Sequence, residues 1–198
     1  MIDRSDLATL ERAGIEDVGA LVAVAADFVR RCPVREPSRT VAPLSASEQE
    51  FLRSTGARGL DADDAAVAAA ERSNLTVLAA EYGQLVASAD SAARVAERLG
   101  VKASRVRQRV GDRSLYAIET SGGRVFPRFQ FAGDRTLPGL DRVLGALDPD
   151  AHPVAVARFF LTPTPDLESD LVDGAVSPRD WLLAGLPAEP VAELAAAR

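Results

Sequence analysis

Residues 91–113 read SAARVAERLGVKASRVRQRVGDR, and this stretch predicts two short helices joined by a tight turn. Asp90 or Ser91 can cap the first helix, because both side chains accept a hydrogen bond from a free backbone N–H. Gly100 suits the left-handed backbone conformation that ends a helix sharply. The apolar residues of the first helix recur at helical spacing: Ala92, Val95, Ala96 and Leu99.

The second helix of the pair has an apolar and a polar face. Ser104 is expected to cap it, and Val106 and Val110, four residues apart, face back toward the first helix. The polar face carries three arginines and a glutamine, side chains suited to guanine and adenine edges in a major groove: Arg105, Arg107, Gln108 and Arg109. The pattern predicts a helix-turn-helix, with an ordinary helical hairpin and a solvated arginine face as the alternative.

Positive charge collects in this part of an acidic chain. Residues 91–135 hold ten cations and four anions, a net charge of +6, whereas the whole chain has a net charge of −6. A basic region inside an acidic protein is an electrostatic footprint for which phosphate backbones are the commonest partner.

A β-hairpin is predicted directly after the second helix. Residues 115–120 and 124–126 are β-prone, and residues 121–123 are the turn sequence Ser-Gly-Gly. A helix-turn-helix followed by a basic hairpin resembles the winged helix-turn-helix of excisionase-like and MerR-like regulators, and from about Leu75 the chain is similar to actinobacterial DNA-binding proteins. The resemblance implies a wing that reaches phosphates or the minor groove through Arg124 and Arg128. The alternative is a hairpin that only packs on the helices.

These patterns predict an interface with double-stranded DNA. Its candidate side chains are Lys102, Ser104, Arg105, Arg107, Gln108, Arg109, Arg113, Arg124 and Arg128.

The predicted fold is mainly α, with a winged helix-turn-helix (two helices plus a β-hairpin) between an N-terminal helical region and a small C-terminal helical domain. The hairpin phenylalanines are expected in the core, and a long helix over residues 61–88 could mediate dimerisation. The predicted organisation is a helix and Pro-rich linker in 1–43, a helical, possible dimerisation region in 44–90, the DNA-binding region in 91–135 and the C-terminal domain in 136–198.

The C-terminal region carries a second pattern. Residues 162–167 read Thr-Pro-Thr-Pro-Asp-Leu after Leu161, and Gly174, Pro178 and Leu182 follow. Over residues 152–197 this resembles the Xre/MbcA/ParS toxin-binding domain of antitoxins. The resemblance implies a homodimer that represses its own operon and neutralises a RES-domain toxin that degrades NAD. The candidate toxin contacts in this acidic region are Trp181, Leu194 and Arg198.

Enzyme chemistry is not expected. His152 is the sole histidine and is a capping or surface residue, and Cys32 has no partner for a zinc site, a catalytic dyad or an intramolecular disulfide. The acidic residues at 61, 63 and 64 fit a helix start better than a metal site. Neither a cofactor nor a membrane span is predicted, and the reducing cytoplasm is the natural compartment.

The sequence therefore predicts a homodimeric, sequence-specific DNA-binding repressor whose most specific form is an antitoxin paired with a RES-type toxin. A stand-alone transcriptional regulator or an architectural DNA-binding protein is the alternative. An adaptor whose basic region binds an acidic protein is the third hypothesis.

Overall fold

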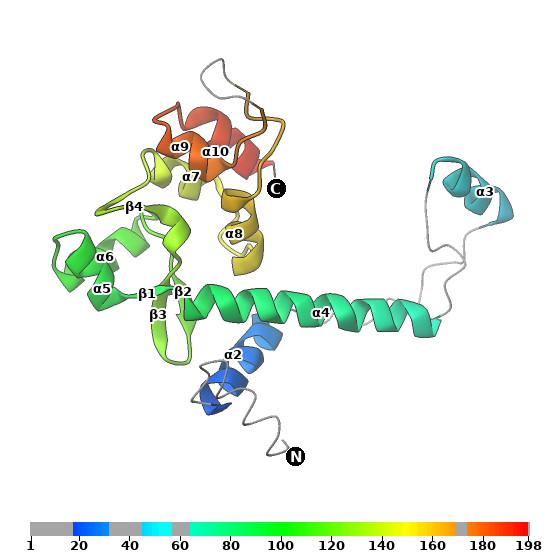
Figure 1. Ribbon diagram of the computed structural model, residues 1–198, viewed down its shortest axis with the longest axis horizontal. Coiled ribbons are helices and arrows are strands. Elements are labelled where there is room, and N and C mark those ends of the chain that lie inside the picture. Colours follow the sequence, from blue (N-terminus) through cyan, green and yellow to red (C-terminus); the bar gives the residue numbers. More distant parts are fainter. Residues whose placement is uncertain (1–17, 32–44, 57–63, 169–173, 198) are drawn as a thin grey trace.

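A computed structural model describes residues 18–31, 45–56, 64–168 and 174–197, and these residues are mainly helical with two small antiparallel sheets (Figure 1). The predicted mainly α class is confirmed. The elements are α2 (Val18–Arg31), α3 (Ala46–Ser54), α4 (Asp64–Ala87), β1 (Asp90–Ser91), α5 (Ala92–Arg98), α6 (Ala103–Gly111), β2 (Ile118–Thr120), β3 (Gly123–Phe126), the 3-10 turn η1 (Arg128–Gln130), β4 (Phe131–Ala132), β5 (Arg135–Thr136), α7 (Leu140–Ala146), α8 (Pro153–Leu161), α9 (Pro178–Leu183) and α10 (Glu189–Ala196).

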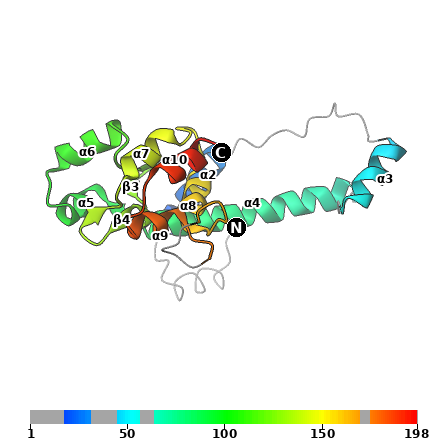
Figure 2. The ribbon, with the colours of Figure 1, turned by 90° about the horizontal axis from the view of Figure 1, so that it is seen from above.

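The long helix α4 runs past the rest of the molecule, and its N-terminal half projects away from it (Figure 2). Its bounds, Asp64–Ala87, agree closely with the helix predicted over residues 61–88. Helix α2 and helix α8 both pack against α4. Arg158 of α8 donates two hydrogen bonds, of 2.9 and 2.7 Å, to the Glu81 carboxylate of α4. The C-terminal half of α4 is therefore held in the body of the protein.

A small aromatic cluster joins α2, α4 and α8. Phe28, Tyr82 and Val154 are buried in it together with Ile118 of β2, and the His152 ring meets Phe28 edge-on with 5.5 Å between centroids. The Nδ1 atom of His152 accepts a hydrogen bond of 3.2 Å from the Val154 N–H at the start of α8. The capping role predicted for this histidine is confirmed.

The first sheet has the strand order β1-β3-β2, with both pairs antiparallel. The hairpin of β2 and β3 was predicted, but β1 was not, because two residues before a helix carry no strand pattern. Asp90 pairs with Phe126 across β1 and β3. This pairing ties the start of α5 to the hairpin, so the two predicted parts of the DNA-binding region are joined by backbone hydrogen bonds.

The predicted first strand was too long at its start, because it was expected from Leu115 and begins at Ile118. The buried side-chain amide of Gln130 replaces a strand partner at Tyr116. Gln130 accepts from the Tyr116 N–H at 2.8 Å and donates to the Tyr116 carbonyl at 2.8 Å and to the Pro127 carbonyl at 2.9 Å. One glutamine thus satisfies backbone groups that a β-ladder would otherwise satisfy.

Helices α7–α10 enclose the largest cluster of buried apolar side chains, which includes Phe160, Leu182 and Val191. Helix α10 packs on α7. A side chain at Gly139, which has a φ of 65°, would collide with Ala188, so glycine is needed there for both conformation and space. Ser177 caps α9, as predicted.

Several predicted features lie outside the described residues: the start of the N-terminal helix, Cys32 with the Pro-rich linker, Asp61, Asp63 and Arg198. Among the residues that are described, no helix has the length and apolar character needed to cross a membrane. The same residues hold no group of three or more potential metal ligands.

Candidate nucleic-acid interface

The two helices predicted from residues 91–113 are present, and local sequence explains how they meet. Ser91 Oγ accepts a hydrogen bond of 3.3 Å from the Arg94 N–H and caps α5. Gly100 has a φ of 62°, and the Val101 N–H then donates to the Ala96 carbonyl at 2.9 Å. This is the left-handed helix end that the glycine predicted.

Helix α6 begins two residues earlier than predicted, at Ala103. Its N-cap is Lys102, which forms no side-chain capping bond, so the prediction that Ser104 caps the helix is wrong. The backbone leaves the turn in an extended conformation at Lys102, and the Lys102 carbonyl already accepts from Arg105 and Val106. Ser104 is therefore inside the first turn, with its side chain exposed.

The apolar face of α6 packs as expected. Val106 is buried beside Val95, Phe126 and Phe131, and Val110 is partly buried on the same cluster. Because this face is fixed in the core, the opposite face of α6 is necessarily turned outward.

Four side chains on the outward part of α6 are exposed: Ser104, Arg105, Arg107 and Gln108. Arg105 Nη1 donates to Gln108 Oε1 at 2.8 Å. The pair leaves further guanidinium donors and the glutamine amide group available, and these are groups that recognise base edges and phosphates. Lys102 is exposed at the beginning of the helix.

Arg109 and Arg113, which were also predicted to be in the interface, are partly buried and have internal partners. Arg109 donates to the Ser114 hydroxyl at 3.2 Å and to the Thr136 hydroxyl at 3.2 Å. Arg113 donates to the carbonyl of Leu147, and its φ is 57°. These guanidinium groups fasten the end of α6 to β5 and to the segment after α7, which distinguishes them from the exposed residues of α6.

The hairpin presents Arg124 at a partly exposed position. Arg124 is paired across the strands with Glu119, and the two side chains form an ion pair. Thr120 Oγ1 donates to the Gly123 carbonyl at 2.7 Å and closes the turn. An exposed ion pair of this kind is weak, so Arg124 can exchange Glu119 for a phosphate at low cost.

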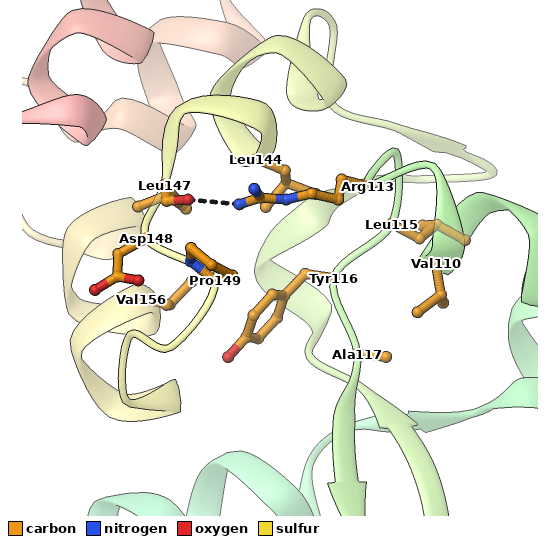
Figure 3. Close-up of a pocket in the computed structure, with 10 residues that line it drawn as sticks. All are labelled: Val110, Arg113, Leu115, Tyr116, Ala117, Leu144, Leu147, Asp148, Pro149 and Val156. Carbon is orange, nitrogen blue, oxygen red and sulfur yellow. Dashed lines mark hydrogen bonds between the residues drawn. The ribbon is translucent and has the colours of Figure 1, made fainter.

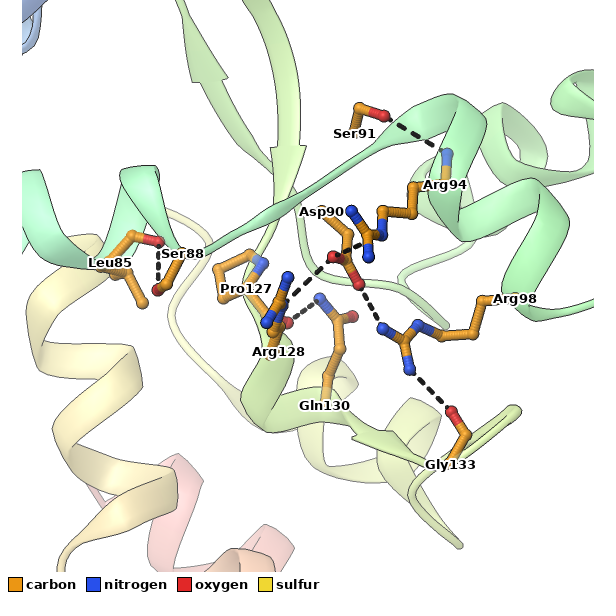
Figure 4. A network of polar contacts seen from close by, with 10 residues as sticks. All are labelled: Leu85, Ser88, Asp90, Ser91, Arg94, Arg98, Pro127, Arg128, Gln130 and Gly133. Atoms are coloured by element: carbon orange, nitrogen blue, oxygen red, sulfur yellow. Dashed lines mark hydrogen bonds and ion pairs between the residues drawn. The ribbon is translucent and has the colours of Figure 1, made fainter. Parts of the chain in front are cut away.

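A buried carboxylate holds the helices and the hairpin together. The Asp90 side chain is fully buried and accepts hydrogen bonds from Arg98 at 2.7 Å and Arg128 at 3.2 Å (Figure 4). Arg94 lies 3.7 Å from the same carboxylate. Arg98 also donates to the Gly133 carbonyl at 2.9 Å.

Electrostatics at Asp90 favour the ionised form. Burial acts to raise the pKa of Asp90, but the hydrogen bond and charge of Arg98 and the charge of Arg128 outweigh it, so the pKa lies below its ordinary value. The carboxylate stays charged at neutral pH and orients three cations from two parts of the chain, Arg94 and Arg98 of α5 and Arg128 of η1. Arg128 keeps an exposed side-chain fraction of 56% and so remains accessible.

The sequence missed three residues of this region. The sequence indicates Asp90 only as a helix cap, no pattern marks Gln130, and Arg135 is only one cation of the basic region. Arg135 of β5 has a side chain that is 84% exposed, and its ion pair is with the adjacent Asp134. It shares an open cleft of about 660 Å³ with Arg105 and Arg109, so charge clustering was the signal that could have identified it.

The candidate toxin contacts do not form one surface in the described residues. Trp181 is buried, and its Nε1 donates to the Pro187 carbonyl at 2.7 Å. Leu194 is partly buried against the same C-terminal core. Arg198 lies outside the described residues. Trp181 therefore holds α9 against the loop before α10, and its role in a toxin contact stays a prediction.

Comparisons with known proteins give one structural similarity. The NMR structure of Rv2175c is similar to this chain, with 33% sequence identity over 55% of this chain and 79% of that one, and a TM-score of 0.42. No protein-family model matches the chain, and no curated protein matches it.

Proposed function

We propose that this protein binds double-stranded DNA through α6 and the β2–β3 hairpin, as a winged helix-turn-helix. The observation that carries the proposal is the division of α6 into two faces. Val106 is buried in the core, whereas Arg105, Arg107 and Gln108 are exposed on a helix with a fixed orientation. An exposed, preorganised helix with these side chains suits the major groove.

The hairpin and the cations around Asp90 supply the sequence-independent part of this proposed interface. Arg124, Arg128 and Arg135 are all exposed to solvent in part, and each follows or belongs to a strand next to the helix pair. Contacts of arginine with phosphates position a protein on DNA and release counterions, so they add affinity without reading sequence. Arg109 and Arg113 act in this scheme as residues that position α6.

A selected duplex site and three single variants test the proposal. The Arg107→Ala and Gln108→Ala variants each remove a candidate base contact, worth about 1–3 kcal/mol or roughly 5- to 150-fold in affinity. Arg53→Ala is the matched control, because Arg53 is an exposed helical arginine on α3, which is outside the proposed interface. Affinity is measured by gel shift on the selected site and on single-base variants of it.

The expected result is lower affinity and relaxed preference at one base pair for Gln108→Ala, with Arg53→Ala unchanged. Equal affinity and preference in all four proteins would refute the assignment of α6. Uniform binding by wild type to every duplex would instead support the alternative of an architectural protein.

We propose, more specifically, that the protein is a repressor that works as a homodimeric antitoxin. Its support is the resemblance of residues 162–167 and 174–182 to the toxin-binding domain, together with the acidic charge of residues 136–198. In this region Leu167 and Leu182 are buried, whereas Leu161 and Leu183 are exposed. Co-purification of the full chain with a RES-domain protein encoded beside it tests this role, and failure to rescue cells from that toxin would refute it.

A further inference from the structure

A cavity of about 230 Å³ lies at the end of α6 (Figure 3). Its wall comes from three separate parts of the chain. Val110 is from α6, Leu115 and Ala117 precede β2, and Leu144 and Val156 are from α7 and α8. The cavity thus lies between the proposed DNA-binding region and the C-terminal helices.

The size and lining of the cavity define the ligand that fits it. An apolar cavity of about 150 Å³ is already large enough to bind benzene, and this one is larger. Most of its lining side chains are aliphatic, and the Tyr116 ring lies among them (Figure 3). Burial of an aromatic ring against such a wall is favourable, at roughly 25 cal/mol per Å² of apolar surface.

Two charged side chains line the same cavity and constrain the charge of a ligand. The Arg113 guanidinium is directed to the Leu147 carbonyl. Asp148 is exposed, and its Oδ1 accepts a hydrogen bond of 2.9 Å from the Asp150 N–H, which leaves the other carboxylate oxygen as an acceptor. With one positive and one negative group, the site favours a neutral molecule that has a hydrogen-bond donor.

We propose that this cavity binds a small, neutral, mainly apolar aromatic molecule with one hydrogen-bond donor, and that its binding alters the affinity of α6 for DNA. The ligand contacts Val110 near the end of α6 and Leu144 of α7 at the same time. Arg113 follows α6 in a left-handed backbone conformation that is strained for a residue with a side chain, and its hydrogen bond to the Leu147 carbonyl connects the end of α6 to the segment after α7. A ligand that favours one arrangement of this junction shifts the position of α6. The regulatory part of the inference rests on the proposed function.

Indole is a suitable probe, because it has two fused apolar rings and one N–H donor. Its binding to the full chain is measured by calorimetry, with indole-3-acetate as a comparison ligand that adds a carboxylate. Ala117→Leu fills the cavity, and Ala80→Leu is the matched control on an exposed position of α4. We expect saturable one-to-one binding of indole, at least about 10-fold weaker in Ala117→Leu because the larger side chain occupies space that the ligand needs, and unchanged in Ala80→Leu.

A second variant keeps the test valid if Ala117→Leu does not fold. Asp148→Asn preserves an oxygen for the Asp150 N–H and removes the charge, so the preference for indole over indole-3-acetate should fall several-fold. Absence of saturable indole binding to wild type, equal affinity in Ala117→Leu, or an unchanged preference in Asp148→Asn would overturn the ligand site.

The DNA measurement separates regulation from the proposed function. Saturating indole should change the affinity of wild type for its DNA site by about 5-fold or more, and should not do so in Ala117→Leu. An unchanged affinity would overturn the regulatory part. If wild type binds indole but no DNA at all, the proposed function fails and the calorimetry still decides the ligand site.

Discussion

Replacing Asp90 by asparagine should destabilise the protein more than its single lost charge suggests. The side chain is fully buried and accepts hydrogen bonds of 2.7 Å from Arg98 and 3.2 Å from Arg128. Hydrogen bonds to charged groups contribute about 1.5–3 kcal/mol each. The cost of removing the carboxylate from water cancels part of that sum.

An asparagine has the same shape but turns an NH₂ group toward one of the two guanidinium groups. We therefore expect a loss of about 2–3 kcal/mol in the free energy of unfolding. For a chain of this size, the melting temperature should fall by about 5–10 °C. Asp134→Asn is the control, since Asp134 pairs with its neighbour on the surface, and its melting temperature should match wild type.

The pH dependence of this difference provides an independent check. Because the pKa of Asp90 is depressed in the folded state, its contribution is full above the unfolded value of about 3.9 and is lost as the pH falls through the lower folded value. The difference in melting temperature between wild type and Asp90→Asn should be constant from about pH 7 to 5 and should shrink below about pH 4. Scanning calorimetry measures it, and a melting temperature equal to that of Asp134→Asn at pH 7 would refute the reasoning.

Three further predictions concern other parts of the chain. Arg124→Ala should weaken binding to all duplexes about equally and lower the salt slope by about one unit or less, and a selective loss at one base pair would show that the hairpin reads sequence. Gln130→Ala should lower the melting temperature by about 5–10 °C, because it leaves buried backbone groups of Tyr116 unsatisfied; a change under 2 °C would contradict this role. Leu75 continues the packed face of α4 beyond its covered half, so Leu75→Lys should convert a dimer to a monomer in sedimentation equilibrium, and a monomeric wild type would exclude the dimer.

The local parts of the candidate interface could be predicted from the sequence. Helix α6 and its turn depend on neighbouring residues, namely the valine spacing of 106 and 110 and the glycine at 100. The N-cap of α6 was predicted at the wrong residue. Its position depends on where the backbone leaves the turn after Gly100, and the sequence allows the helix to begin after either Lys102 or Ser104.

Contacts between distant residues could not be predicted in this way. Asp90 meets Arg128 across 38 positions, and Gln130 meets Tyr116 across 14. In the sequence, Arg109 and Arg113 look like Arg105, since all three are arginines in or next to the same basic helix. Their hydrogen-bond partners on β5 and after α7 can be identified only in the folded chain. The same limit applies to Trp181, whose partner Pro187 lies in a loop.

The salt dependence of DNA binding by the unmodified protein tests the central claim most directly. The cations proposed to contact phosphates are Arg124, Arg128 and Arg135, and Lys102 is a fourth exposed cation at the start of α6. Each phosphate contact contributes about −0.9 to the slope of log K against log salt, so we expect a slope of about −4 between 50 and 200 mM salt by fluorescence anisotropy. A slope near zero, or no binding to any duplex at 50 mM salt, would contradict the assignment of this protein as a DNA-binding protein.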